Sequence, residues 1–205
     1  ESDDYHIFLF SYFVLKNLDD QKRIRGLDLE KRKQLEFLHS YSMFGLHELF
    51  DQQCKYFVLI RNPIDRALSL YHWIKEKWPE EHILRKECQE LSFIDWHCKN
   101  IPPNFQTILV SGLWYETAIA KDKAALTKAI ENIKKHYLCA LPLDRFDQGL
   151  SILEKDTGLS FSRTERKHVN KQRQYSDSLT SREIDKLKER ESLDLTLFEY
   201  VHHQY

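Results

Sequence analysis

Residues 55–77 hold an apolar segment of strand length that meets a helix within two residues. The run Val58, Leu59, Ile60 is typical of a strand buried in a parallel sheet. Asparagine at position 62 is a good N-cap and proline at position 63 suits the first helical position, so a helix is predicted over Pro63–Lys77. Its apolar face comprises Ile64, Ala67, Leu68, Tyr71 and Ile74. A buried strand that leads directly into an amphipathic helix is typical of α/β folds.

The rest of the chain continues this alternation of strands and helices. A second buried strand is predicted over 137–141, and 7–15 fits either a strand or part of a helix. Helices are predicted over 27–38, 123–136, 146–157, 180–190 and 193–203, with a short helix or turn over 44–50. Thr180 and Glu183 match a capping box. We therefore expect a helix-rich α/β fold with a small, mainly parallel sheet flanked by helices.

The size and charge of the chain limit its organisation and its partners. The length of 205 residues predicts one domain over 1–205. Basic and acidic residues number 31 and 32, so no global field favours nucleic acid. No apolar stretch approaches the ~20 residues of a membrane span. The acidic start at 1–4 is not typical of a signal peptide, and the missing initiator methionine leaves open that further sequence precedes residue 1.

Cysteine and glycine positions argue against several kinds of site. The four cysteines have no C-x-x-C spacing, so buried thiols in a reducing compartment are predicted rather than disulfides or zinc: Cys54, Cys88, Cys98 and Cys139. His97 adjoins Cys98, but no second pair has the spacing of metal ligands, so no metal is expected. The five glycines lie too far apart for a glycine-rich dinucleotide loop or a Walker loop.

The strand-to-helix junction carries the chemistry of an anion site. Arg61 ends the strand, and Ser69 lies two turns into the helix. Backbone N–H groups at a helix start, the helix dipole, a guanidinium and a hydroxyl together favour phosphate. The alternatives are an ion pair of Arg61 with Asp65 and a solvated position for Ser69. Arg66 is predicted to be a surface or structural ion-pair residue.

Residues 61–71 resemble the signature R-[DN]-P-x-x-R-x-x-S-x-Y of sulfotransferases of the carbohydrate-type branch, which includes the heparan 2-O-sulfotransferases and many bacterial relatives. Other segments resemble the family in the same order: 44–48, 105–107 with 111–112, 144–147 with Leu150, 169–173, and 193–194 with 197–200. The second of these is similar to a "Q-T…S-G" stretch of the family, and the last to its closing helix. The resemblance covers about residues 30–203.

The resemblance implies a fold, a donor and a reaction. The implied fold has three layers around a parallel sheet and is similar to that of P-loop nucleotide-binding proteins. The implied donor is 3'-phosphoadenosine 5'-phosphosulfate (PAPS), which becomes adenosine 3',5'-bisphosphate (PAP) when its sulfuryl group passes to an acceptor hydroxyl, here on a carbohydrate. Arg61 and Ser69 would hold the 3'-phosphate. Lys171 and Arg173 would close over the nucleotide, although a solvated basic loop is the alternative for these two.

One part of the family pattern, the P-K-T-G-[ST]-[ST] loop that cradles the 5'-phosphosulfate, is not visible in this chain. One alignment places this loop on 6–18, where Leu9, Phe10, Ser11 and Tyr12 replace the lysine, threonine and glycines. Apolar residues at these positions could not bind phosphosulfate. The other alignment places the loop upstream of residue 1, and the spacing of the later segments fits this version better.

The second missing part is the general base. The histidine of the family's G-H-x-x-F context aligns with Tyr41, and a tyrosine with a pKa near ~10 is a poor base at neutral pH. His39 and His47 are the candidate bases, each with a structural role as its alternative. The sequence therefore leaves two functions open: a PAPS-dependent sulfotransferase whose donor loop lies outside this chain, or an inactive relative that keeps a nucleotide or anion pocket or serves as an interaction module.

Overall fold

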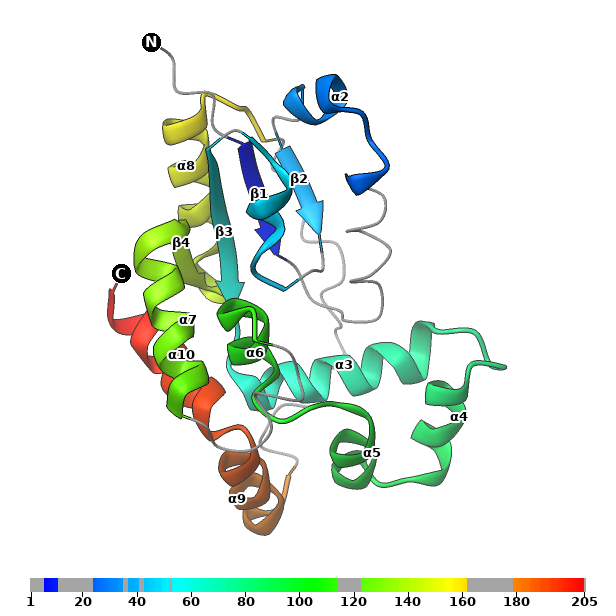
Figure 1. Ribbon diagram of the computed structural model, residues 1–205. Coiled ribbons are helices and arrows are strands. Elements are labelled where there is room, and N and C mark those ends of the chain that lie inside the picture. Colours follow the sequence, from blue (N-terminus) through cyan, green and yellow to red (C-terminus); the bar gives the residue numbers. More distant parts are fainter. Residues whose placement is uncertain are drawn as a thin grey trace.

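A four-stranded parallel sheet forms the centre of the fold (Figure 1). The computed structural model describes residues 6–10, 24–34, 37–40, 43–51, 53–113, 123–161 and 179–204. The strands are β1 (His6–Phe10), β2 (Phe37–Ser40), β3 (Cys54–Ile60) and β4 (Tyr137–Pro142), and they lie in the order β2-β1-β3-β4. The predicted parallel sheet and α/β class are confirmed. Of the two structures considered for 7–15, a strand or part of a helix, the strand is present at residues 7–10.

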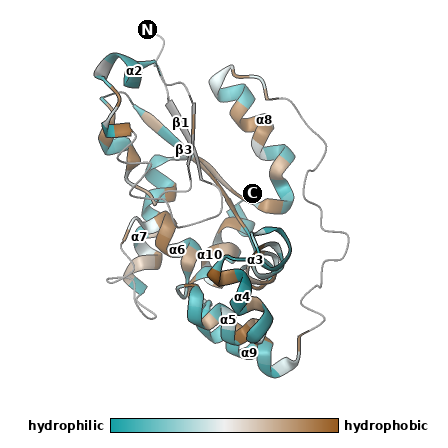
Figure 2. Cartoon of the chain, turned by 90° about the vertical axis from the view of Figure 1, so that its right-hand side faces the viewer, coloured by the Kyte–Doolittle hydropathy of each residue, from teal (hydrophilic) through white to brown (hydrophobic). Residues whose placement is uncertain are grey.

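Helices cover both faces of this sheet, as Figure 2 shows. Helices α7 (Lys123–His136) and α10 (Ser192–Gln204) cover one face of the sheet, and α8 (Phe146–Thr157) covers the other. Tyr56 and Val58 belong to a core cluster with Leu197 of α10, whereas Phe57 packs with Leu153 of α8. This arrangement explains the continuous apolar run of β3, because successive side chains point to opposite faces and both faces are buried.

Helix α3 (Pro63–Lys77) leads away from the end of β3 and carries a group of smaller helices (Figure 1). These are α4 (Ile83–Glu90), α5 (Phe93–Asn100) and α9 (Ser181–Arg190). Ile74 of α3 packs with Trp96 of α5, and Leu68 packs with Leu187 of α9. The predicted capping box is present, because Thr180 N donates to Glu183 Oε2 at 2.9 Å and Glu183 N donates to Thr180 Oγ1 at 3.3 Å.

The remaining elements are short: α2 (Leu29–Lys33), η1 (Leu46–Leu49), α6 (Phe105–Ser111) and η2 (Leu143–Arg145). The helix predicted over 27–38 is therefore wrong beyond Lys33, because Phe37 and Leu38 pair with β1 in the sheet. Ladder hydrogen bonds to a partner strand outweigh the local preference of such a short segment. None of the helices in the described part of the chain is long and apolar enough to cross a membrane.

All four cysteines are thiols rather than disulfides, and Cys54, Cys88 and Cys139 are buried. Burial raises the pKa of the Cys54 thiol to about 12 and that of Cys88 to about 11. These thiols are therefore uncharged at neutral pH, where thiolate chemistry is suppressed.

Candidate functional site

Arg61 follows β3 at the carboxyl edge of the sheet. The last residue of β3, Ile60, pairs with Pro142 at the end of β4, and Phe10 at the end of β1 pairs with Val58. The chain therefore leaves three neighbouring strands at the same edge. Ligands of open α/β sheets bind outside the carboxyl ends of the strands, so Arg61 lies where this architecture forms its sites.

The backbone of Arg61 is held on both sides by one side chain. Arg61 N donates to Gln106 Oε1 at 2.9 Å, and Gln106 Nε2 donates to the Arg61 carbonyl oxygen at 2.8 Å. Gln106 belongs to α6 and is only 5% exposed. Hydrogen bonds from which water is excluded are stronger than those in solvent. The buried amide thus fixes the point from which the Arg61 side chain departs.

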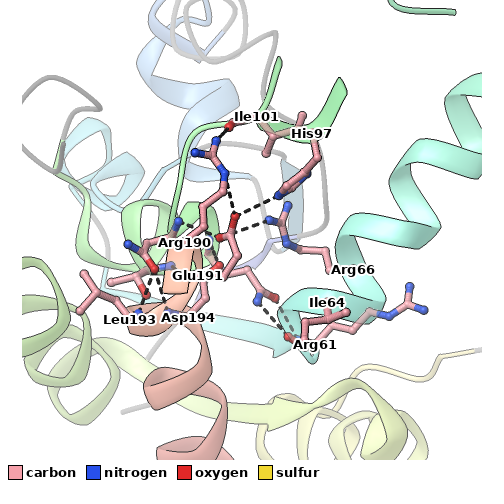
Figure 3. Close-up of polar contacts among 12 residues, drawn as sticks. Arg61, Ile64, Arg66, His97, Ile101, Arg190, Glu191, Leu193 and Asp194 are labelled. Carbon is pink, nitrogen blue, oxygen red and sulfur yellow. Dashed lines mark hydrogen bonds and ion pairs between the residues drawn. The ribbon is translucent and has the colours of Figure 1, made fainter. Parts of the chain in front are cut away.

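The Arg61 side chain itself is half-buried, and Figure 3 shows it extending away from the neighbouring charged residues. Within the described residues its guanidinium makes no hydrogen bond or ion pair, so the alternative ion pair with Asp65 is not formed there. A partly solvated guanidinium that no carboxylate in the described part of the chain neutralises is suited to bind an anion through two parallel hydrogen bonds.

The start of α3 contributes less to an anion site than the sequence predicts. Asn62 is the N-cap, as predicted, and its Oδ1 accepts hydrogen bonds from Ile64 N at 3.0 Å and Asp65 N at 3.3 Å. Two of the helix's first N–H groups are therefore already paired. The positive end of the helix dipole remains beside Arg61.

Of the other predicted anion-binding residues, Ser69 lies in the part of the chain that the structure describes. Ser69 lies in α3 and is half-buried, but no hydrogen bond joins it to Arg61 in the part of the chain that the structure describes. Lys171 and Arg173 lie outside the described residues. In the alignment that places the donor loop on 6–18, Leu9 and Phe10 belong to β1, whereas Ser11 and Tyr12 lie outside the described residues, as does Tyr41.

The candidate base His47 hydrogen-bonds to Tyr56 beside the amino-terminal part of β3. His47 Nδ1 lies 2.6 Å from the Tyr56 hydroxyl oxygen, which also accepts from His47 N at 2.9 Å and from Gly45 N at 3.3 Å. Because two N–H groups already bind the hydroxyl oxygen, its own proton is available to the tautomer of His47 whose Nδ1 carries no hydrogen. Tyr56 precedes Arg61 by five residues, which is about 16 Å along a strand at ~3.3 Å per residue.

His47 also lies within a cluster of aromatic rings. The ring centroids of His47 and His136 are 4.9 Å apart, and Phe44 lies within 5.1 Å of both. Burial lowers the pKa of His47 and of His136. This environment agrees with the structural alternative for His47. His39 belongs to β2, and its side chain lies outside the described residues.

Behind Arg61 lies a buried group of charged residues that the sequence did not indicate (Figure 3). Glu191, between α9 and α10, accepts a hydrogen bond from His97 Nε2 at 2.9 Å and another from Asn104 N at 2.8 Å. Its Oε2 lies 3.9 Å from Arg66 Nη2. Arg66 is 1% exposed, so the surface position considered for it is wrong and the structural ion pair is confirmed.

Burial and charge shift the pKa values within this group. Burial lowers the pKa of His97 and keeps its imidazole neutral. Burial alone would raise the pKa of Glu191, but the hydrogen bond from His97 and the charge of Arg66 outweigh it and lower the pKa. Glu191 is therefore the negative partner of the Arg66 guanidinium.

A second buried carboxylate, Asp194, joins α10 to the start of α6. Asp194 Oδ2 accepts from Gln106 N at 3.0 Å, and Oδ1 accepts from Thr107 N at 2.7 Å. In return, Asn104 Oδ1 accepts from Leu193 N at 2.9 Å. The starts of α6 and α10 are thus joined by hydrogen bonds in both directions. One of these bonds is made by the backbone of Gln106, whose side chain binds Arg61.

The described residues contain no group of three histidine, cysteine or acidic side chains that could hold a metal ion. A scan against protein-family models finds no family that matches this chain, and a search of curated proteins finds no match.

Proposed function

We propose that this protein binds PAPS and PAP at the carboxyl edge of a sulfotransferase-like, three-layer sheet of the P-loop type, and transfers the sulfuryl group to an acceptor hydroxyl on a carbohydrate. The observation that carries the proposal is Arg61, whose backbone is fixed by Gln106 while its guanidinium has no acceptor among the described residues. A fixed guanidinium beside a helix start fits a dianionic phosphate.

The contacts among the family-like segments support the same proposal. Gln106 of the "Q-T" stretch binds Arg61 of the signature, and Thr107 N binds Asp194 of the closing helix. Phe44 N donates to the Leu109 carbonyl oxygen at 2.8 Å, and a Cβ added to Gly112 would lie only 2.8 Å from the Phe44 carbonyl oxygen. Segments that are far apart in sequence therefore contact one another along α6, Gln106 at its start next to Arg61 and Leu109 and Gly112 towards its other end next to Phe44.

The transfer would form a bond between the acceptor oxygen and the sulfur while the bond from sulfur to the 5'-phosphate oxygen breaks. PAP leaves, and the acceptor hydroxyl gives up its proton to a base. Arg61 and Ser69 would hold the 3'-phosphate during this step, and Lys171 and Arg173 would cover the nucleotide. The base is unassigned, because His47 Nδ1 lies 2.6 Å from the Tyr56 hydroxyl oxygen and the His39 side chain lies outside the described residues.

Calorimetric titration with PAP tests the binding part of the proposal. Arg61→Ala should weaken binding about 10- to 100-fold, since a hydrogen-bonded charge contact contributes roughly 1.5–3 kcal/mol. Lys77→Ala is the matched control, because it removes one exposed positive charge from the last turn of the same helix. Its dissociation constant should stay within about two-fold of wild type. Absence of binding by wild type, or equal losses in both variants, would refute the site.

The alternative function, an inactive relative that keeps the nucleotide pocket, is favoured by the position of His47. The imidazole is hydrogen-bonded to Tyr56 at 2.6 Å, beside the other end of β3 from Arg61. Incubation with sulfur-labelled PAPS and a panel of carbohydrate acceptors distinguishes the two functions. Label transfer supports the enzyme, and PAP binding without transfer to any acceptor supports the inactive relative.

A further inference from the structure

We infer that Gln106 is a positioning residue for Arg61, and that Asp194 of the C-terminal helix keeps Gln106 in place. This inference rests on the proposed function, because it assigns to both residues a role in the selectivity of that site for a 3'-phosphate. Neither side chain would contact the nucleotide.

The first link is the pair of hydrogen bonds between one amide and one residue. Gln106 accepts from Arg61 N at 2.9 Å and donates to Arg61 O at 2.8 Å, so both peptide groups that flank the Arg61 Cα are held. Both bonds involve a side chain that is 5% exposed. A two-pronged contact between guanidinium and phosphate depends on geometry, and a site whose supporting residues are loose loses much of its contact energy.

The second link fixes the backbone of Gln106 itself. Both oxygens of Asp194 are used, one by Gln106 N at 3.0 Å and one by Thr107 N at 2.7 Å. Asp194 is fully buried, and its own backbone N–H donates to Asn104 Oδ1 at 3.3 Å. The position of Arg61 is therefore coupled to the start of α10, which lies more than a hundred residues later in the chain.

The other end of α6 offers a matched control for a purely structural role. Asn132 of α7 is 2% exposed, and its Nδ2 donates to the carbonyl oxygens of Val110 at 2.9 Å and Ser111 at 3.0 Å. Gln106 and Asn132 are thus buried amides that each make two side-chain hydrogen bonds to backbone groups, one next to the start and one next to the end of the same helix. Only Gln106 reaches Arg61.

The experiment compares PAP with adenosine 5'-monophosphate, which lacks the 3'-phosphate, by calorimetry. Wild type should prefer PAP by about 10- to 100-fold, the range expected for a charge-assisted contact. Gln106→Met removes both hydrogen bonds without adding charge, and it should reduce this preference at least five-fold while affinity for the monophosphate changes less than two-fold. Asn132→Leu should lower the melting temperature but keep the preference within two-fold of wild type.

Arg61→Ala provides the final comparison. In that background, Gln106→Met should not reduce the preference further, because the contact it positions is already gone. If Gln106→Met does not fold, Gln106→Asn takes its place, since the shorter amide cannot span both Arg61 groups, and the same loss is expected.

The possible failures can be told apart. A wild type that shows no preference for PAP overturns the proposed function and this inference together. A preference that is lost in Arg61→Ala but kept in a folded Gln106 variant overturns the inference alone. Equal losses in the Gln106 and Asn132 variants also overturn it, because they would reflect damage to α6 rather than the position of Arg61.

Discussion

Glu191→Leu is predicted to cause a large loss of stability. The carboxylate is fully buried, accepts two hydrogen bonds at 2.8 and 2.9 Å, and is the negative partner of Arg66, which lies 3.9 Å away. Leucine would remove the carboxylate that faces the buried Arg66 guanidinium at 3.9 Å, and breaking a buried ion pair by removing one partner typically costs about 3–5 kcal/mol. Because ~1 kcal/mol shifts the melting temperature by roughly 2–4 °C at this chain length, the expected drop is about 6–20 °C.

Urea unfolding followed by circular dichroism measures this loss. The midpoint should fall while the slope m is unchanged, because the surface exposed on unfolding stays the same. Lys99→Ala is the control. It breaks an ion pair with Glu87 at 2.9 Å whose lysine is largely exposed, and its midpoint should not move measurably.

A double variant tests the electrostatic cause. Arg66→Met combined with Glu191→Leu removes both charges, and replacement of a whole buried ion pair by apolar side chains is often close to neutral. The double variant should therefore be more stable than Glu191→Leu alone by roughly 2 kcal/mol, so that the losses of the two single variants do not add. A loss below about 1 kcal/mol for Glu191→Leu, or losses that simply add, would refute the reasoning.

Two further predictions concern packing and pH. Gly149→Ala should destabilise the fold by about 1–3 kcal/mol, although alanine has the better helix propensity. The reason is that the added Cβ would lie 2.8 Å from Phe57 Cζ and 3.0 Å from Leu141 Cδ1. A higher melting temperature for this variant would contradict the prediction. Burial lowers the pKa of His47 and His136 below their ordinary value of 6.5, so these groups bind fewer protons in the folded state. Their contribution to the free energy of unfolding is complete above about pH 6.5 and is lost as pH falls through the lowered values. His136→Phe should make the decline shallower in urea titrations between pH 7.5 and 5.5, and an unchanged decline would contradict the assignment.

The parts of the fold that the sequence predicts correctly depend on local signals. The neighbouring residues Asn62 and Pro63 mark the start of α3, and Thr180 with Glu183 marks the start of α9. The strand over 37–40 was not predicted, because its four residues become a strand only by pairing with β1, which lies some 30 residues earlier. Local periodicity carries no information about such a partner.

The candidate site shows the same division. Arg61 stands out because it follows an apolar strand and precedes a helix start. The charge of Arg66, in contrast, is balanced by Glu191, a residue between two helices that has no distinguishing pattern. Gln106 is 45 residues from Arg61, and its amide contacts follow only from the three-dimensional arrangement of α6 and β3. Local sequence therefore identifies Arg61, whereas the residues that hold and surround it, Gln106 and Glu191, follow only from contacts between distant segments.

The most direct test of the account is phosphorus NMR of PAP as the protein is added, since the 3'- and 5'-phosphates give separate resonances. The 3'-phosphate resonance should shift on binding to wild type, and this shift should be lost in Arg61→Ala but kept in Lys77→Ala. A 3'-phosphate resonance that does not respond to wild type, or that responds equally to Arg61→Ala, would contradict the claim that Arg61 is the 3'-phosphate ligand.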